Sequence, residues 1–85
     1  MKQFCDISDE YIESKHKKIA SNIKNIRIEK GITQEHVALS MGFTTATFYT
    51  NAENFKNSKH FNLEHLMKIA IILDIDICEF FKELI

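Results

Sequence analysis

Proline is absent from this 85-residue sequence, and glycine occurs only twice, at Gly31 and Gly42. Sheet proteins use Gly, Pro and Asn-Gly pairs in their turns, so a chain with so few of these residues has little room for strands and hairpins. We therefore expect an all-α fold. The length suits one domain, because 85 residues are too few for two independent cores.

Cysteine is also scarce, since the chain has only Cys5 and Cys78. Their spacing fits neither a zinc site nor a redox pair, and the four histidines lack ligand partners at suitable spacing, so we expect no metal and no cofactor. Cys78 lies in an apolar stretch and is predicted to be a small buried residue. The longest apolar run, residues 69–73, is too short to cross a membrane, and the N-terminus is too acidic for a signal peptide. These features predict a cytoplasmic protein without a membrane partner.

The net charge is only −1, but the charges are unevenly distributed along the sequence. Residues 15–68 carry nine Lys and Arg against four Asp and Glu, whereas residues 1–14 and 69–85 each carry one Lys against four acids. A basic middle between acidic ends allows a local positive surface that the total charge hides. The alternative is a solvated surface whose charges segregate without a functional reason.

Apolar residues at helical spacing, together with capping residues, predict five helices. The apolar face of the first helix carries Ile19, Ile23 and Ile26. This helix is expected to end at Gly31, because glycine often closes a helix. Ser8 and Ser14 are both able to cap its start. We expect residues 1–14 to form an N-terminal extension and residues 15–85 to form the helical domain.

The other four helices are placed by residues whose side chains accept a hydrogen bond from the first helical turn. These caps are Thr33, Thr44, Asn62 and Asp76. Asp76 and Glu79, three residues apart, predict an acidic variant of the capping box. The apolar residues expected on the inner faces are Val37, Ala38, Met41, Phe48, Ala52, Phe55, Leu63, Leu66, Ile69, Ala70, Leu73, Ile77, Phe80, Phe81 and Leu84. Residues 54–62 are predicted to form a loop.

Residues 33–53 predict two short helices joined by a tight turn, which is the helix-turn-helix arrangement. Ala38 has to be small because the two helices cross closely above it. Gly42 has to adopt a positive φ, which a Cβ would penalise. Thr44 is expected to cap the second of these helices. The free backbone N–H groups at the start of that helix are then available to a phosphate.

Two patches of the sequence carry a family pattern. The first comprises Gly31, Ile32, Thr33, Gln34, Glu35, Val37 and Ala38, followed by Met41, Gly42, Phe43 and Thr44. The second comprises Leu63, Leu66, Lys68, Ile69, Ala70, Leu73 and Asp76. Together with Arg27 at the end of the first helix, these patches resemble the Cro/cI-type repressor family over about residues 19–84. The resemblance implies a five-helix repressor-like fold that binds duplex DNA, with Gln34 on a DNA phosphate.

The sequence departs from the family pattern at one place, because the Glu at the end of the recognition helix falls one position late, at Glu53. Two registers of that helix follow. In the first register Phe48 is the core anchor, and Thr45, Ala46 and Thr50 face the DNA groove. In the second register Tyr49 and Ala52 are in the core, and Ala46, Thr47 and Asn51 face the groove. The residues after the helix, including Lys56, fit the second register better.

The predicted recognition helix and its turn are rich in threonine, although β-branched residues lower helix propensity. Threonine suits a groove reader, because its hydroxyl bonds to bases or phosphates and its methyl group contacts thymine. The candidate DNA-binding residues are Gln34, Thr44, Thr45, Ala46, Thr47, Thr50, Asn51, Lys56 and Lys59. They predict sequence-specific binding of double-stranded DNA by a transcriptional regulator, with a repressor favoured. Because the helix has no Arg to read guanine, we expect an A·T-rich site.

A homodimer is expected, because the C-terminal segment with Phe80, Phe81, Leu84 and Ile85 is more apolar than one small core requires. The alternative function is a protein-interaction module of the same fold, such as an antitoxin or adaptor, with weak or no DNA binding. The absence of Lys and Arg from the recognition helix favours that alternative. An enzyme is not expected, because the sequence has no recognisable nucleophile–base pair, carboxylate pair or phosphate loop.

Overall fold

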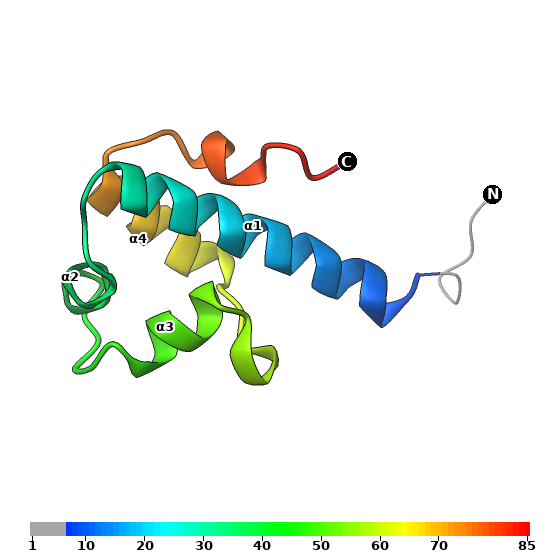
Figure 1. The fold of residues 1–85 in the computed structure, drawn as a ribbon, viewed down its shortest axis with the longest axis horizontal. Helices are drawn as coiled ribbons and strands as arrows, with labels where there is room; N and C mark the ends of the chain where they lie inside the picture. The colour runs from blue at the N-terminus through cyan, green and yellow to red at the C-terminus, as the bar shows by residue number, and fades with distance from the viewer. Residues whose placement is uncertain (1–6) are drawn as a thin grey trace.

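The computed structural model describes residues 7–85, which form four α-helices, two short 3-10 helices and no strand (Figure 1). The elements are α1 (Asp9–Glu29), α2 (Gln34–Ser40), α3 (Thr47–Glu53), η2 (Lys56–Ser58), α4 (Leu63–Leu73) and η3 (Ile77–Phe81). The all-α class is confirmed for these residues, but the predicted count of five helices is wrong. The last predicted helix is the 3-10 segment η3, which has only five residues, and such short segments favour the tighter geometry. Cys5 lies outside the described residues.

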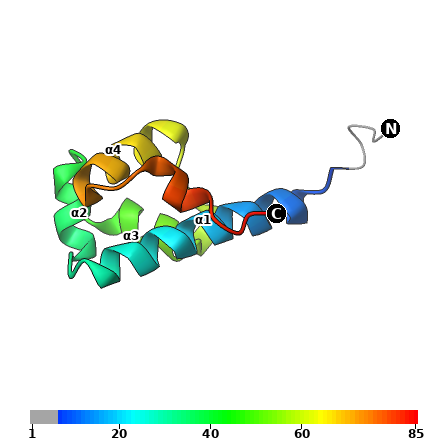
Figure 2. The same ribbon diagram turned by 90° about the horizontal axis from the view of Figure 1, so that it is seen from above.

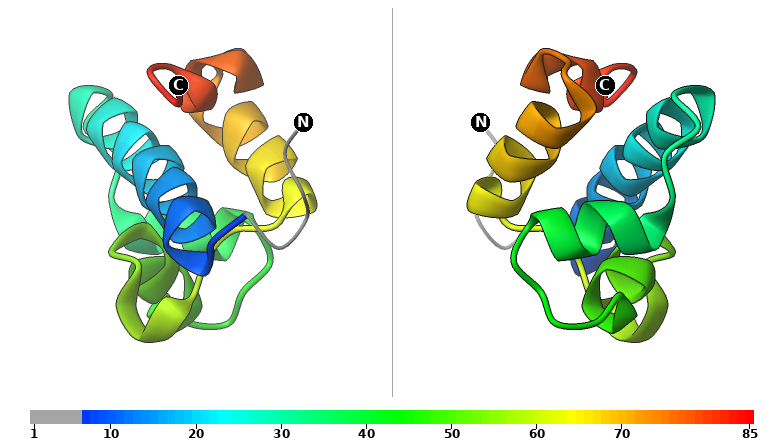
Figure 3. Two further views of the ribbon diagram at one scale, coloured as in Figure 1. Left: turned by 90° about the vertical axis from the view of Figure 1, so that its right-hand side faces the viewer. Right: turned by 90° about the vertical axis from the view of Figure 1, so that its left-hand side faces the viewer.

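The helices surround one core, with α1 as the longest element. Figure 1 shows the first turns of α1 extending beyond the other helices. Seen from above, η3 lies between α1 and α4 (Figure 2). Seen along its length, the molecule has α1 and α4 on opposite sides, while α2 and α3 close the lower end (Figure 3). This arrangement leaves the outer face of α3 at one end of the molecule.

Every α-helix and η3 contribute buried apolar side chains to the core. These are Ala20, Ile23, Val37, Ala38, Met41, Tyr49, Ala52, Phe61, Leu66, Ile69, Ala70, Leu73 and Phe80. Most were expected from helical spacing, but Leu63, Phe81 and Cys78 are exposed. In a 3-10 helix, residues three apart share a face. Ile77 is half-buried and Phe80 buried, whereas Cys78 and Phe81 share a different, exposed face, so the prediction of a buried Cys78 is wrong.

Side-chain caps begin three of the α-helices as predicted. Ser8, rather than Ser14, caps α1 by accepting from the Tyr11 N–H at 3.1 Å, so α1 continues across the boundary predicted between residues 14 and 15. Thr33 caps α2 at 3.0 Å, and the Asn62 side chain caps α4 at 2.8 Å. These local bonds satisfy amide groups that have no partner within the helix.

The predicted cap at Thr44 is wrong, whereas the predicted cap at Asp76 is confirmed without its capping box. The N-cap residue of α3 is Ala46, which makes no side-chain cap, and the Thr45 hydroxyl instead accepts weakly from the Thr47 N–H at 3.4 Å. Threonine side chains compete locally for backbone groups, which explains why α3 begins two residues later than a Thr44 cap requires. Asp76 does cap η3 by accepting from the Cys78 N–H. Glu79 pairs with Lys82 at 2.8 Å instead of completing a capping box.

Lowering the pH from about 7.5 to 5 is expected to lower the melting temperature through His65 and His16. The His65 Nδ1 accepts from the Asn62 N–H, a bond that requires the neutral ring, and burial lowers the pKa of His65 below 6.5. Burial and the stacked ring of His60 also lower the pKa of His16, which lies between Lys15 and Lys17. The unfolded chain therefore takes up protons first, and stability falls as the pH drops below 6.5.

Thermal unfolding of a His65→Asn variant checks this expectation, because the variant should lose part of the pH dependence. His36→Asn, on an exposed position of α2, should keep the wild-type dependence. Equal pH dependence in wild type and His65→Asn would contradict the role given to His65.

Ala38 is fully buried in the core on α2, which packs against α3 and α4. Ala38→Leu is expected to overpack the core and to lower the free energy of unfolding by about 1–3 kcal/mol. Ser40→Leu, at an exposed position of the same helix, should change it by about 0.5 kcal/mol or less. Denaturant unfolding of both variants provides the comparison, and an unchanged stability of Ala38→Leu would mean that the crossing is loose.

Candidate nucleic-acid interface

Residues 41–46 connect α2 to α3, a longer connection than the tight turn predicted from the sequence, and Gly42 and Phe43 lie near its start. Gly42 has a φ of 101°, as the sequence predicted, and a side chain at this φ would be strained. The Phe43 N–H donates to the Ala38 carbonyl oxygen at 3.1 Å, which closes the end of α2. The Phe43 ring packs against Phe48 with ring centroids 5.3 Å apart. The turn therefore fixes the angle between α2 and α3.

The inner face of α3 is formed by Tyr49 and Ala52, both fully buried. These are the core residues of the second register predicted from the sequence. Phe48, the core anchor of the first register, is only half-buried and packs beside Phe43 and Phe61. Of the two core assignments, that of the second register is confirmed.

Glu53 at the end of α3 is the centre of a buried polar network. Its carboxylate accepts from Arg27 Nε at 2.9 Å and from Arg27 Nη2 at 3.0 Å, which is a two-pronged ion pair between α1 and α3. It also accepts from the Tyr49 hydroxyl at 2.7 Å and from Gln34 Nε2 at 2.9 Å. Thr50 extends the network by donating to Gln34 Oε1 at 3.3 Å. The Glu53 carboxylate thereby connects α1, α2 and α3.

The pKa values of the network follow from its geometry. Burial works to raise the pKa of Glu53, but hydrogen bonds from Arg27, Tyr49 and Gln34 outweigh burial and hold the pKa below its ordinary value. Burial, reinforced by the neighbouring Glu53 carboxylate, raises the pKa of the Tyr49 phenol. Glu53 is therefore ionised and Tyr49 protonated at neutral pH, as their hydrogen bond requires.

The outer face of α3 presents polar side chains away from the core. Thr47 is exposed and Asn51 half-buried, and they lie four residues apart on the same side of the helix. Among the described residues, neither side chain forms a hydrogen bond to another group of the protein. Ala46 precedes them at the start of the helix and is half-buried. This face offers one amide and one hydroxyl to a bound molecule.

The remaining predicted site residues lie around α3. Thr44 and Thr45 are exposed in the turn before it, and Lys56 and Lys59 are exposed in the segment after it. Thr50 lies on α3 itself and donates to Gln34, the first residue of α2. The hydrogen bonds from Tyr49 and Gln34 to Glu53 were not predicted from the sequence. The four-residue spacing of Tyr49 and Glu53 was the one local signal for them.

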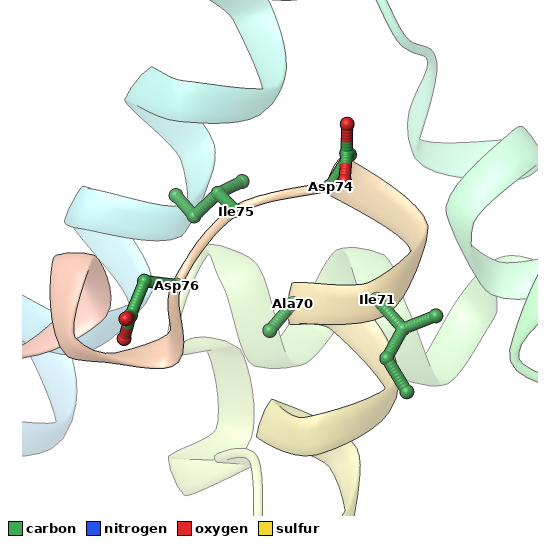
Figure 4. Close-up of a pocket in the computed structure, with 5 residues that line it drawn as sticks. All are labelled: Ala70, Ile71, Asp74, Ile75 and Asp76. Atoms are coloured by element: carbon green, nitrogen blue, oxygen red, sulfur yellow. The ribbon is translucent and has the colours of Figure 1, made fainter.

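A hollow of about 530 Å³ lies at the end of α4, lined by Ala70, Ile71, Asp74, Ile75 and Asp76. The two carboxylates point in opposite directions, so they do not form the convergent pair of an acid–base site (Figure 4). Among residues 7–85, no cluster of three or more His, Cys, Asp or Glu side chains is arranged to hold a metal ion. In the same part of the chain, no helix combines the length and apolar character of a membrane span.

The region that contains this site matches a known protein family. A family model described as a Cro/C1-type HTH DNA-binding domain matches residues 22–82. The matched range includes α2, α3, α4 and η3. Comparison with curated proteins and with solved structures gave no match.

Proposed function

Because the chain belongs to the Cro/C1-type helix-turn-helix family of DNA-binding domains, we propose that it is a transcriptional regulator that binds a specific sequence of duplex DNA. The observation that carries this proposal is the outer face of α3, where Thr47 and Asn51 project away from a buried inner face. A helix of this kind fits the major groove and reads base edges with its outward side chains. The family is in general not enzymatic.

Base reading falls to the outer face of α3. Asn51 is able to form two hydrogen bonds with an adenine, and the methyl groups of Thr47 and Ala46 are able to contact thymine. Since α3 contains no Arg or Lys, guanine is read weakly. We therefore propose an A·T-rich site and favour repression as the mode of regulation.

Phosphate contacts set the position of α3 without reading sequence. Gln34 is the first residue of α2, and its side chain is hydrogen-bonded to Glu53 and Thr50 of α3. We propose that Gln34 contacts the backbone of one DNA strand. Thr44, Thr45, Lys56 and Lys59 are proposed to contact the backbone on either side of the groove. Their exposure in the segments flanking α3 supports this assignment.

A homodimer is part of the proposal, because two copies read a two-fold symmetric site with half-sites about one helical turn apart. Phe80 is committed to the protomer core, which leaves Phe81 and Ile85 as the exposed apolar residues of the C-terminal segment. These two residues are the proposed contact between the copies.

The interaction-module alternative is favoured by one observation on α4. Leu63, Met67 and Ile71, spaced four apart, are 60%, 51% and 79% exposed and form an apolar stripe. Binding through this stripe would depend little on salt, whereas phosphate contacts weaken steeply as salt rises.

Selection of duplexes from a randomised library tests the proposed function. The full chain is expected to enrich an A·T-rich inverted repeat. Enrichment of no motif over repeated rounds, with binding that is insensitive to salt, would favour the interaction module instead.

A further inference from the structure

The lysines of α1 divide between two faces of the helix. Lys15 donates to the carbonyl oxygen of Leu84, and Lys18 lies 4.0 Å from the carboxylate of Glu83. Both therefore point toward the C-terminal segment. Asn22, four residues after Lys18, lies on the same face and donates to carbonyl oxygens of that segment. The face of α1 that carries Lys15 and Lys18 therefore contacts the C-terminal segment.

Lys17 and Lys24 lie on the other face, with Ser21 between them at helical spacing. This face borders a hollow of about 280 Å³ at the C-terminal end of α3. The Lys24 Nζ is 3.5 Å from the Asn54 Oδ1, and the Lys17 Nζ is 5.5 Å from the centroid of the Phe55 ring. Both ammonium groups are thus held beside the segment that follows α3.

The hollow is positively charged. Within residues 7–85, Glu53 is the one acidic residue that lines it, and Glu53 is only 3% exposed. Its carboxylate is occupied by Arg27, Tyr49 and Gln34, so it does not neutralise the two lysines. Ser21 adds an exposed hydroxyl that is able to donate a hydrogen bond. This set of groups suits an anion with several oxygen atoms.

The position of the hollow relative to α3 indicates which anion it receives. The C-terminal end of α3 points toward the middle of α1, and η2 lies beside it (Figure 1). Lys56, the first residue of η2, directly follows Phe55 of the hollow. When α3 lies in a major groove, the phosphate backbone bordering that groove passes the end of the helix.

We propose that Lys17 and Lys24 on α1, with Ser21, form a phosphate-binding site for the DNA backbone that flanks the groove occupied by α3. The site extends the contacts of Lys56 and Lys59 onto the first helix. It depends on the proposed function, because duplex DNA is its ligand. The contacts strengthen binding to every sequence alike, since phosphates carry no sequence information.

The test compares two double variants that remove the same charge. Lys17→Gln/Lys24→Gln removes the proposed site, whereas Lys18→Gln/Lys68→Gln removes lysines that pair with Glu83 and Glu64 elsewhere. Affinity for a random-sequence duplex is measured for both at about 50–200 mM salt. For the first variant, the slope of log affinity against log salt is expected to be shallower by nearly two units, at about 0.9 for each lost phosphate contact.

The control is expected to keep the wild-type slope, and Lys17→Arg/Lys24→Arg should restore it. Equal melting temperatures of the variants would exclude a folding effect. Equal slopes in both Gln variants, with steep salt dependence in the wild type, would overturn this site and leave the proposed function standing. Failure of the wild type to bind any duplex at low salt would overturn both.

Discussion

Glu53→Ala is expected to lower the free energy of unfolding by about 3–5 kcal/mol, because it leaves the Arg27 guanidinium buried without its partner. Arg27 is only 8% exposed, and the Tyr49 hydroxyl loses its acceptor as well. Small domains have about 5–15 kcal/mol of stability in total, so the variant should lose a large fraction of its stability. Denaturant unfolding followed by circular dichroism measures the loss.

Two further variants separate the buried pair from a general effect of lost charge. Glu29→Ala removes an exposed carboxylate at the end of α1 and should change stability by about 0.5 kcal/mol or less. Arg27→Met/Glu53→Leu replaces both ions by apolar side chains and should lose less than Glu53→Ala alone. A Glu53→Ala protein as stable as Glu29→Ala would show that the network does not hold α3 against α1.

Asn51→Ala is expected to weaken binding to the preferred duplex by roughly 5- to 150-fold, which corresponds to about 1–3 kcal/mol for a two-bond contact with adenine. Binding to random duplex should change much less, because phosphate contacts dominate there. Asn51 is half-buried on the outer face of α3, so its truncation removes little from the core. Fluorescence titration with the two duplexes measures both effects.

Asn25→Ala is the matched control, since Asn25 is an exposed amide of α1 that lines a hollow beside Lys82 rather than α3. It should leave both affinities unchanged. Equal losses for Asn51→Ala on preferred and random duplexes would mean that Asn51 contacts the backbone and does not read a base.

Features that depend on neighbouring residues were predictable from the sequence. Thr33 and Asn62 act as caps through bonds to residues three positions later. Gly42 occupies a backbone conformation that side chains rarely adopt. Each of these outcomes is decided within one turn of helix, so a local pattern is sufficient to predict it.

The register of α3 could not be decided locally. Phe48 and Tyr49 are both aromatic, and either is able to fill a core. What distinguishes them is the Tyr49 hydroxyl, which bonds to Glu53, whose own partner Arg27 is 26 residues away along the chain. The choice between the two registers therefore rests on a contact between helices.

Local sequence patterns also could not predict the conformation of the C-terminal segment or which lysines share a face of α1. Helical spacing predicted an α-helix after Asp76, but the short segment adopts 3-10 geometry, and Cys78 is exposed as a result. Lys17 and Lys18 are adjacent in the sequence, yet they border different elements. Which lysine borders α3 depends on how α1 is rotated about its axis in the packed domain.

Amide chemical-shift mapping during titration with the selected duplex tests the central claim most directly, because it locates the bound DNA on the protein. We predict shifts concentrated at Gln34, residues 44–51 and residues 56–59, which disappear as salt is raised. Shifts confined to the α4 stripe of Leu63, Met67 and Ile71, or no shifts at low salt, would contradict the account of α3 as the DNA-reading helix.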